Sequence, residues 1–339
     1  MRTPSPQPTR RRFTAALLAA ALPLTLSGCL LQGEGSGGGG NDADTLSIDY
    51  ATYNPLSLVL RRQGWLEQEL KDDGVDVRWV FSAGSNKANE LLRAGAVDVG
   101  STAGVAALLN RANGAPTKVV AIANRPEWAA LMAKPDSGIT EVSQLRGRSL
   151  AATRGTDPYF FAVQAIEQAG LSPSDVEIQN LQHADGRNAL ENGSVAAWAG
   201  LDPIMAGAQH DGAAFLHRDL ELNTFSVVQA DEDFLEQEPE TAQTVLDAYE
   251  RARAWVLDHP EETAQILAED AGIDIEVART VIRERTNADV SPVPGDDLRD
   301  VLARTGPILV DTGDVDYQHQ VDAALDTLFD PRFAEEATR

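Results

Sequence analysis

The chain has 339 residues, of which 28 are lysine or arginine and 52 are aspartate or glutamate, giving a formal net charge of −24 at pH 7. Because so acidic a surface repels phosphates, we expect no nucleic acid among its partners. The length exceeds a typical single core and favours two lobes.

The first residues resemble an export signal. Residues 9–13 read Thr-Arg-Arg-Arg-Phe, like a twin-arginine motif, and an apolar run follows. Residues 26–29 read Leu-Ser-Gly-Cys and resemble a lipobox. An uncleaved membrane anchor is the alternative, but Cys29, the single cysteine, stands where a lipobox requires it. We therefore predict that residues 1–29 are a lipoprotein signal with lipidated Cys29 at its end, exported by the twin-arginine route to the extracytoplasmic side of the cell membrane.

Residues 30–44 are rich in glycine and predict a flexible tether, so the folded body should begin near Thr45. With the only thiol carrying lipid, no disulfide, cysteine-ligated metal site or cysteine nucleophile is available. We predict no metal and no cofactor. Nothing beyond the signal is apolar enough to span a membrane.

From Thr45 to about Ala230 short apolar strands alternate with amphipathic helices, the pattern of an α/β fold. The predicted strands are 46–50, 75–81, 97–100, 119–123, 131–133, 149–153, 176–181, 196–200 and 225–230. Proline and glycine mark the ends of several helices: Asn54-Pro55 opens one that Gly64 closes, and Asp157-Pro158 opens another that Gly170 closes.

Beyond Asp231 the pattern is helical only. Apolar residues recur at three- and four-residue spacing over 240–257, 261–271, 275–285, 297–304 and 317–328. We predict lobe 1 over residues 45–133, lobe 2 over 134–228, and a return to lobe 1 with a helical tail over 229–339. The chain should cross between lobes near 133–138 and again near 225–231, and two crossings make a hinge.

Small polar residues repeatedly follow a strand and precede a helix, where open α/β sheets bind ligands. Helix N-termini there offer free N–H groups to an anion. The best instance is Ser101 and Thr102, before a helix start with no acidic cap; Ser82 and Gly84 form a second. For a single turn, ordinary capping is the alternative interpretation.

Two turns place an aspartate before the proline that starts a helix. These are Asp157, after Arg154, Gly155 and Thr156, and Asp202. Each carboxylate would cap its helix, or would face the cleft and accept an ammonium or hydroxyl group of the ligand. Arg154 could pair with an anionic head group.

Aromatic and amide side chains complete the predicted site. Tyr53, Trp128 and Tyr159 could line the part of the site that holds a short alkyl chain. The predicted ligand-binding residues are Tyr53, Asn54, Ser82, Gly84, Ser101, Thr102, Trp128, Arg154, Gly155, Thr156, Asp157, Tyr159 and Asp202.

Several motifs together resemble the substrate-binding lipoproteins of ABC importers for aliphatic sulfonates, taurine and nitrate, most of all the aliphatic-sulfonate branch. They are Phe-Ser-Ala-Gly at 81–84, Gly-Ala-Val-Asp-Val-Gly-Ser-Thr at 95–102, Ser-Gln-Leu-Arg-Gly at 143–147, Arg-Gly-Thr at 154–156 and Ala-Trp-Ala-Gly-Leu-Asp-Pro at 197–203. The resemblance implies a type II periplasmic-binding-protein fold that closes on its ligand, with the turns at Ser82, Ser101-Thr102 and Thr156 around the head group. Asp157-Pro158 replaces the serine-rich turn usual in this family, and Leu201 stands where an aromatic residue is common.

The expected function is that of a monomeric, non-catalytic receptor. It would capture a small organic anion, a sulfonate such as an alkanesulfonate or taurine, and deliver it to an inner-membrane ABC permease. The alternatives are a binder of nitrate, bicarbonate or a thiamine-precursor pyrimidine, an enzyme on the same fold, or a sensory or adhesive lipoprotein. The export signal and the lack of a free cysteine disfavour the enzyme.

Overall fold

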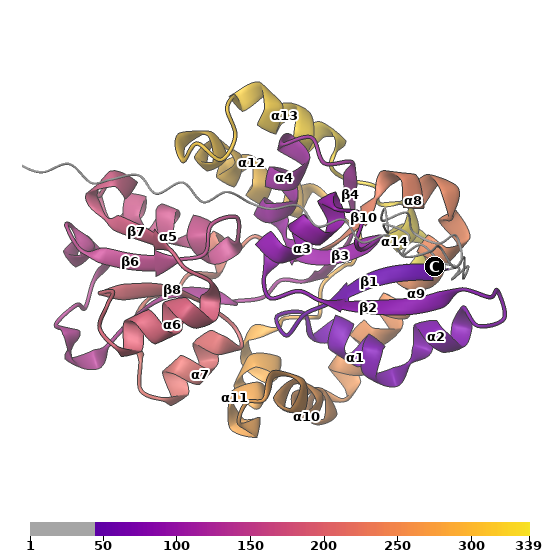
Figure 1. Ribbon diagram of the computed structural model, residues 1–339, viewed down its shortest axis with the longest axis horizontal. Helices are drawn as coiled ribbons and strands as arrows, with labels where there is room; N and C mark the ends of the chain where they lie inside the picture. Colours follow the sequence, from indigo (N-terminus) through magenta and orange to yellow (C-terminus); the bar gives the residue numbers. More distant parts are fainter. Residues whose placement is uncertain (1–44) are drawn as a thin grey trace, which may run out of the picture. The chain divides into compact units, whose positions relative to one another are not determined.

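A computed structural model describes residues 45–339, which form two five-stranded sheets with helices packed around them (Figure 1). The expected lipoprotein signal and tether lie outside the described residues. Within them, no helix combines the length and apolar character needed to cross a membrane.

The first sheet has the order β2-β1-β3-β10-β4. Its strands are β1 (Thr45–Tyr50), β2 (Asp76–Phe81), β3 (Val99–Ala103), β4 (Thr117–Asn124) and β10 (Ser226–Asp231). β1 pairs in parallel with β2 and β3, whereas β10 runs antiparallel between β3 and β4. The middle strand β3 is buried along its whole length and extends past the predicted end at residue 100 to include Ser101 and Thr102.

The second sheet has the order β7-β6-β8-β5-β9. Its strands are β5 (Ala129–Ala133), β6 (Ser149–Ala152), β7 (Glu177–Asn180), β8 (Ala197–Leu201) and β9 (Ala214–His217). β6 pairs in parallel with β7 and β8, and β5 runs antiparallel to β8 and β9. Each sheet therefore combines parallel strands with one returning antiparallel strand.

Seven helices lie between the strands of these two sheets. They are α1 (Pro55–Gln63), α2 (Trp65–Glu69), α3 (Ser85–Arg93), α4 (Gly104–Ala112), α5 (Asp157–Gln168), α6 (His183–Glu191) and α7 (Ile204–His210). Gly64 ends α1 in the left-handed conformation, with φ of 64°, as the sequence predicts. α6 and α7 pack on β8, and α4 packs on β3 and β4.

The C-terminal region is helical. It contains α8 (Glu232–Gln237), α9 (Pro239–Asp258), α10 (Pro260–Ala271), α11 (Ile275–Thr280), a π-helical turn (Val281–Arg285), α12 (Asp296–Asp311), α13 (Gln318–Thr327) and α14 (Arg332–Ala337). α9 packs on α1 and α13 on α4, so this region packs against helices of the first sheet. α12 also reaches α5 beside the second sheet.

The structure places both crossings earlier than expected. β5 pairs only within the second sheet, so the first crossing is the segment 125–128, before β5 rather than after it. The second crossing runs between His217 and Ser226, since β9 and β10 belong to different sheets. Residues 125–128 and 218–225 are thus the two connecting segments of the hinge, which we call the hinge strands although neither is a β-strand.

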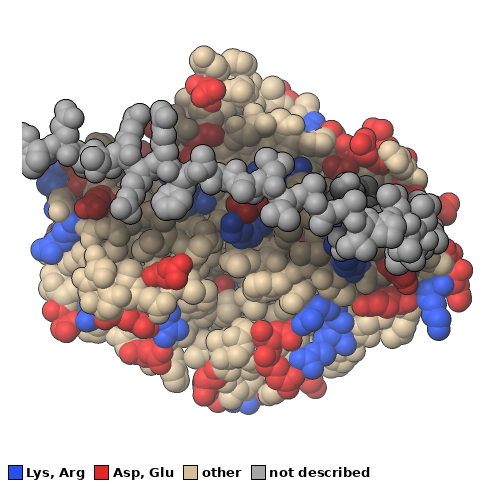
Figure 2. Space-filling view, in the orientation of Figure 1, with Lys and Arg blue, Asp and Glu red and all other residues tan. Residues whose placement is uncertain are grey.

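Acidic side chains spread over the face of the molecule in Figure 2, with basic ones interspersed among them. Most ion pairs are at the surface, for example Arg62 with Glu269, where such pairs contribute little to stability. Among residues 45–339, no group of three or more potential metal ligands comes together.

Candidate functional site

A small cavity lies where the first hinge strand, the turn after β8, the start of α1 and the C-terminal π-turn converge. Its volume is about 10 Å³, which is room for roughly one water molecule. The lining residues are Tyr53, Pro55, Asn124, Pro126, Trp128, Asp202, Val281, Arg285 and Thr286. Residues from both sheets therefore meet in a closed and nearly filled cleft.

Two aromatic rings form one wall of this cavity. Tyr53, at the carboxyl end of β1, contacts Trp128 of the first hinge strand edge to face, with ring centroids 5.8 Å apart. The Tyr53 hydroxyl donates to the Ser101 carbonyl at 2.8 Å, and Trp128 Nε1 donates to Asp157 Oδ2 at 2.6 Å. With both polar tips already bonded, the two residues present apolar ring surface to the cavity.

An ion pair between Asp202 and Arg285 forms the opposite wall. Arg285 Nη1 lies 3.1 Å from Oδ1 and 3.2 Å from Oδ2 of Asp202, and both side chains are buried. The Asp202 Oδ1 also accepts from the backbone N–H of Ala206 in α7. Burial raises the pKa of Asp202 to about 6, an effect that the charge and hydrogen bonds of Arg285 oppose. Asp202 is thus both a helix cap and a residue of the cavity.

Asp157 neither caps α5 nor faces the cavity, the two roles that its position before Pro158 predicts. Its carboxylate accepts from Trp128, and from the backbone N–H and the hydroxyl of Thr224 in the second hinge strand. It makes no capping bond to α5 and does not line the cavity. Burial raises its pKa to about 6, against the effect of these hydrogen bonds. Asp157 therefore joins the two hinge strands.

The anion site expected at Ser101 and Thr102 is already filled by the protein itself. Both residues lie inside β3, because α4 begins only at Gly104. The Gly104 N–H donates to the Thr224 carbonyl, and the Val105 N–H donates to the Thr224 hydroxyl. The hinge therefore takes the helix-terminal donors that an anion would use.

An acidic group also competes at this place, contrary to expectation. Asp49 of β1 accepts from the N–H and the hydroxyl of Ser101, and Gln229 donates to the Thr102 hydroxyl. Burial raises the pKa of Asp49 to about 7, while its hydrogen bonds from Ser101 act in the opposite direction. The side chains of Ser101 and Thr102 thus support the core of the first sheet.

The remaining predicted turns meet across the two lobes, outside the cavity. A side chain at Gly84 would come within 2.9 Å of His183 Nε2, so only glycine allows this approach. Burial lowers the pKa of His183 to about 4. Gly155 lies beside Asn86 of α3 at ordinary contact distance, and its φ of 74° favours glycine there. Ser82, Asn54 and Thr156 are fully buried nearby, and the Thr156 hydroxyl donates to the Thr153 carbonyl.

Arg154 and Tyr159 face a lateral groove instead of the cavity. Arg154 donates to the Tyr159 hydroxyl at 3.1 Å and to the Thr312 carbonyl of the chain after α12 at 3.4 Å. The groove, about 700 Å³, runs along α5, β7 and the end of α12. Neither residue therefore lines the cavity in this closed arrangement.

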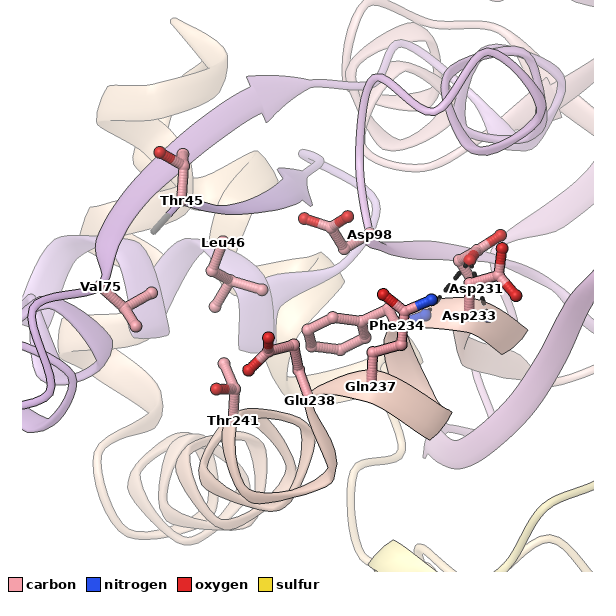
Figure 3. Close-up of a pocket in the computed structure, with 10 residues that line it drawn as sticks. All are labelled: Thr45, Leu46, Val75, Asp98, Asp231, Asp233, Phe234, Gln237, Glu238 and Thr241. Carbon is pink, nitrogen blue, oxygen red and sulfur yellow. Dashed lines mark hydrogen bonds between the residues drawn. The ribbon is translucent and has the colours of Figure 1, made fainter. Parts of the chain in front are cut away.

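A second concave region, about 360 Å³ in volume, is shown in Figure 3. Thr45 and Leu46 begin β1 and Asp98 directly precedes β3, so the region lies at the amino ends of these parallel strands. Asp231 and Glu238 add further carboxylates. Its place at the opposite edge of the sheet and its acidic lining disfavour an anionic ligand.

The cavity contains Tyr53, Trp128 and Asp202 from the predicted set. Arg285, Asn124 and Thr286 line it too and were missed. Arg285 was predicted as the last residue of a helix over 275–285, with nothing in its apolar spacing to distinguish it from exposed Arg283. The π-helical turn that buries Arg285 has no marker in the sequence.

Comparison with known proteins agrees with this architecture. Residues 59–263 match the family described as NMT1/THI5 like. Two relatives named putative aliphatic sulfonates-binding protein are each 26% identical. The one from Escherichia coli K12 matches over 74% of this chain and 79% of its own length, and the one from Bacillus subtilis 168 over 91% and 94%.

Solved structures share the fold at lower identity. The alkanesulfonate-binding protein SsuA from Xanthomonas axonopodis pv. citri, bound to MOPS, superposes with a TM-score of 0.75 at 20% identity, covering 84% of this chain and 99% of that one. The desulfurization enzyme DSZB superposes with a TM-score of 0.66 or less at 17% identity, covering 87% and 99%. The chain belongs to the NMT1/THI5-like family and has the two-lobed type II periplasmic-binding-protein fold.

Proposed function

We propose that this protein is the extracytoplasmic substrate-binding component of an ABC importer, which captures a small organosulfonate and delivers it to the permease. The observation that carries the proposal is the cavity between the lobes, where Tyr53 and Trp128 face a buried cation-carboxylate pair. An alkyl chain fits the rings, and a charged head group fits the polar wall. The two sulfonate-binding relatives support the same ligand class.

Ligand entry requires the lobes to separate. A cavity of about 10 Å³ admits one water, whereas sites for small organic ligands measure about 300 Å³ or more. Asp202 directly follows β8 of the second sheet, while Arg285 follows α10 and α11, of which α10 packs against α1 of the first lobe. Opening at the two hinge strands would part these side chains, and the ligand would be enclosed when they return.

Among the two aspartates considered, Asp202 is the one able to meet a ligand ammonium group, because Asp157 does not line the cavity. A desolvated carboxylate gains most from a ligand cation. We expect taurine to bind about tenfold more tightly than ethanesulfonate, which differs mainly in lacking the amine, as roughly 1.4 kcal/mol for one charged pair would give. Titration calorimetry of residues 45–339 measures both affinities.

The control for this comparison is Asp202→Asn, in which the advantage of taurine should vanish, while the exposed Asp185→Asn should keep it. Ethanesulfonate binding more tightly than taurine to the unmodified protein would mean that the ligand is a simple alkanesulfonate. A parallel thermal-shift panel of sulfate, nitrate, bicarbonate and thiamine precursors tests the other ligands. A ligand at 100 times its dissociation constant should stabilise the protein by about 2.7 kcal/mol.

We propose binding without catalysis, although a desulfurization enzyme shares the fold. The chain has one cysteine, Cys29, which lies outside the described residues and which we propose to be lipidated. His183 is buried against Gly84 and Thr153, away from the cavity. A receptor should return its ligand unchanged after prolonged incubation, as mass spectrometry would show; any released sulfite or sulfate would indicate an enzyme.

The membrane anchor is part of the same proposal. We expect Cys29→Ala to leave the fold intact but to release the protein from the membrane or leave it unprocessed, because acyl chains would be its strong apolar attachment. Detergent-phase partitioning with far-ultraviolet circular dichroism measures both properties, with Ser27→Ala as the control. Equal partitioning of Cys29→Ala and the unmodified protein would contradict a lipid anchor.

A further inference from the structure

Arg285 is buried in a way that leaves part of its hydrogen-bonding capacity unused. Its side chain is 2% exposed, one Nη bonds Asp202 and the other bonds Gln209. Its Nε is buried and donates to no group among residues 45–339. A buried donor without a partner is energetically unfavourable, so an acceptor at this place would stabilise the site.

The position of Arg285 places its guanidinium group at the site described above. Arg285 is the one cationic residue among those that line the cavity. It ends a π-helical turn, a distortion that is frequent at functional sites. A guanidinium with free N–H donors is the side chain best suited to hold a sulfonate or carboxylate.

The Asp202–Arg285 pair admits a simpler interpretation, namely a latch that only holds the lobes together. Burying two charges is expensive, and such pairs often contribute no net stability. The unsatisfied Nε also argues against a purely structural role, because a structural ion pair would be more stable with all its donors satisfied. Both observations favour a pair that serves ligand exchange.

We propose that Arg285 binds the anionic head of the ligand and that Asp202 is an internal competitor for the same guanidinium in the empty cleft. This inference rests on the function proposed above and adds the anion-binding residue to it. An incoming sulfonate would accept from the Nε and displace the carboxylate from Nη1. The affinity for a simple anion then depends on how much more strongly the Arg285 guanidinium binds that anion than it binds the Asp202 carboxylate.

The proposal predicts opposite effects for the two members of the pair. With ethanesulfonate as the probe, Arg285→Gln should weaken binding by about ten- to a hundredfold, the equivalent of losing one or two charge-assisted hydrogen bonds. Asp202→Asn should strengthen binding of the same probe by about tenfold, since the competing charge is gone. A latch predicts that both variants change affinity in the same direction, because either one breaks the contact.

Arg62→Gln is the matched control. Arg62 lies in α1, far from the hinge segments in sequence, and pairs with Glu269 at 2.8 Å, but it does not line the cavity. The Arg62→Gln variant removes the same charge and should leave the affinity within about twofold. A second comparison is Arg285→Lys, which keeps the charge, lacks the Nε donor and should lose most of the affinity.

A double variant that removes both charges serves as a control for misfolding of the single variant. If Arg285→Gln alone does not fold, because it leaves Asp202 unpaired, the double variant Asp202→Asn with Arg285→Gln keeps a neutral pair and still lacks the cation. It should bind ethanesulfonate at least tenfold more weakly than Asp202→Asn. Equal affinity of these two variants would overturn the inference.

The two proposals can fail separately. If the unmodified protein binds sulfonates and the Arg285 variants bind them equally well, the function stands and the inference is wrong. If it binds only nitrate or bicarbonate, and Arg285→Gln abolishes that binding, the inference stands and the sulfonate is wrong. If thermal shift detects no bound anion from the panel, both are overturned.

Discussion

Asp157→Ala is expected to lower the free energy of unfolding by about 3–5 kcal/mol, because it leaves buried donors of Trp128 and Thr224 without an acceptor. These two residues lie on different hinge strands, so the loss falls on the connection between the lobes. Urea denaturation followed by tryptophan fluorescence and circular dichroism measures the change.

The environment of Thr224 explains why the expected loss is large. Its hydroxyl donates to Asp157 and accepts from the N–H of Val105 at the start of α4. The next residue, Phe225, has φ of 61°, an uncommon and strained conformation for a bulky side chain. Asp157 therefore stabilises a strained segment as well as its own hydrogen bonds.

Two further variants serve as controls for this prediction. Asp157→Asn keeps one carboxamide oxygen as an acceptor and should lose less than half as much stability as Asp157→Ala. Asp185→Ala, in the exposed first turn of α6, should change stability by less than about 1 kcal/mol. A loss below 1 kcal/mol for Asp157→Ala would show that the hinge strands are held by other contacts.

Much of the fold could be predicted because strand and helix periodicities are local properties. The alternation of strands with helices, and the helical region beyond Asp231, follow from apolar spacing. The sheet to which β5 belongs does not, because its buried apolar run fits either sheet equally well. β9 was missed as a short, half-exposed edge strand, and α12 continues beyond the expected end at residue 304, through Pro307.

The candidate site was less predictable because it depends on contacts between distant segments. Asp157 and Asp202 have the same local pattern, an aspartate before a proline, yet one joins the hinge and the other lines the cavity. The free helix start expected after Thr102 is closed by Thr224, more than 100 residues away. Only tertiary structure decides which donors are free.

The stability of the protein is also expected to depend on the ionisation of Asp49. Burial raises the pKa of Asp49 in the folded protein to about 7 from its ordinary value of 3.8. The stability that this group contributes is fully present below pH 3.8, where it is protonated in both states. It is lost as the pH rises through 7, because the unfolded chain releases the proton first.

The size of this effect follows from the shift. The rise in the pKa of Asp49 from 3.8 to about 7 corresponds to a free energy of unfolding that falls by about 4 kcal/mol between pH 4 and pH 7. Asp157 and Asp202, with pKa values raised to about 6, act in the same direction. His183 opposes them, since its pKa is lowered to about 4 and its contribution is lost as the pH falls from 6.5 to 4.

Asp49→Asn isolates the carboxylate from these other groups, because their contributions cancel when the variant is compared with the unmodified protein. The amide keeps an oxygen for the N–H and hydroxyl of Ser101. We expect the variant to gain up to about 4 kcal/mol relative to the unmodified protein between pH 4 and pH 7. Urea denaturation at each pH measures this difference, and the exposed Asp185→Asn should show none. A constant difference across this range would mean that Asp49 is ionised in the folded protein at pH 4, with the hydrogen bonds from Ser101 outweighing its burial.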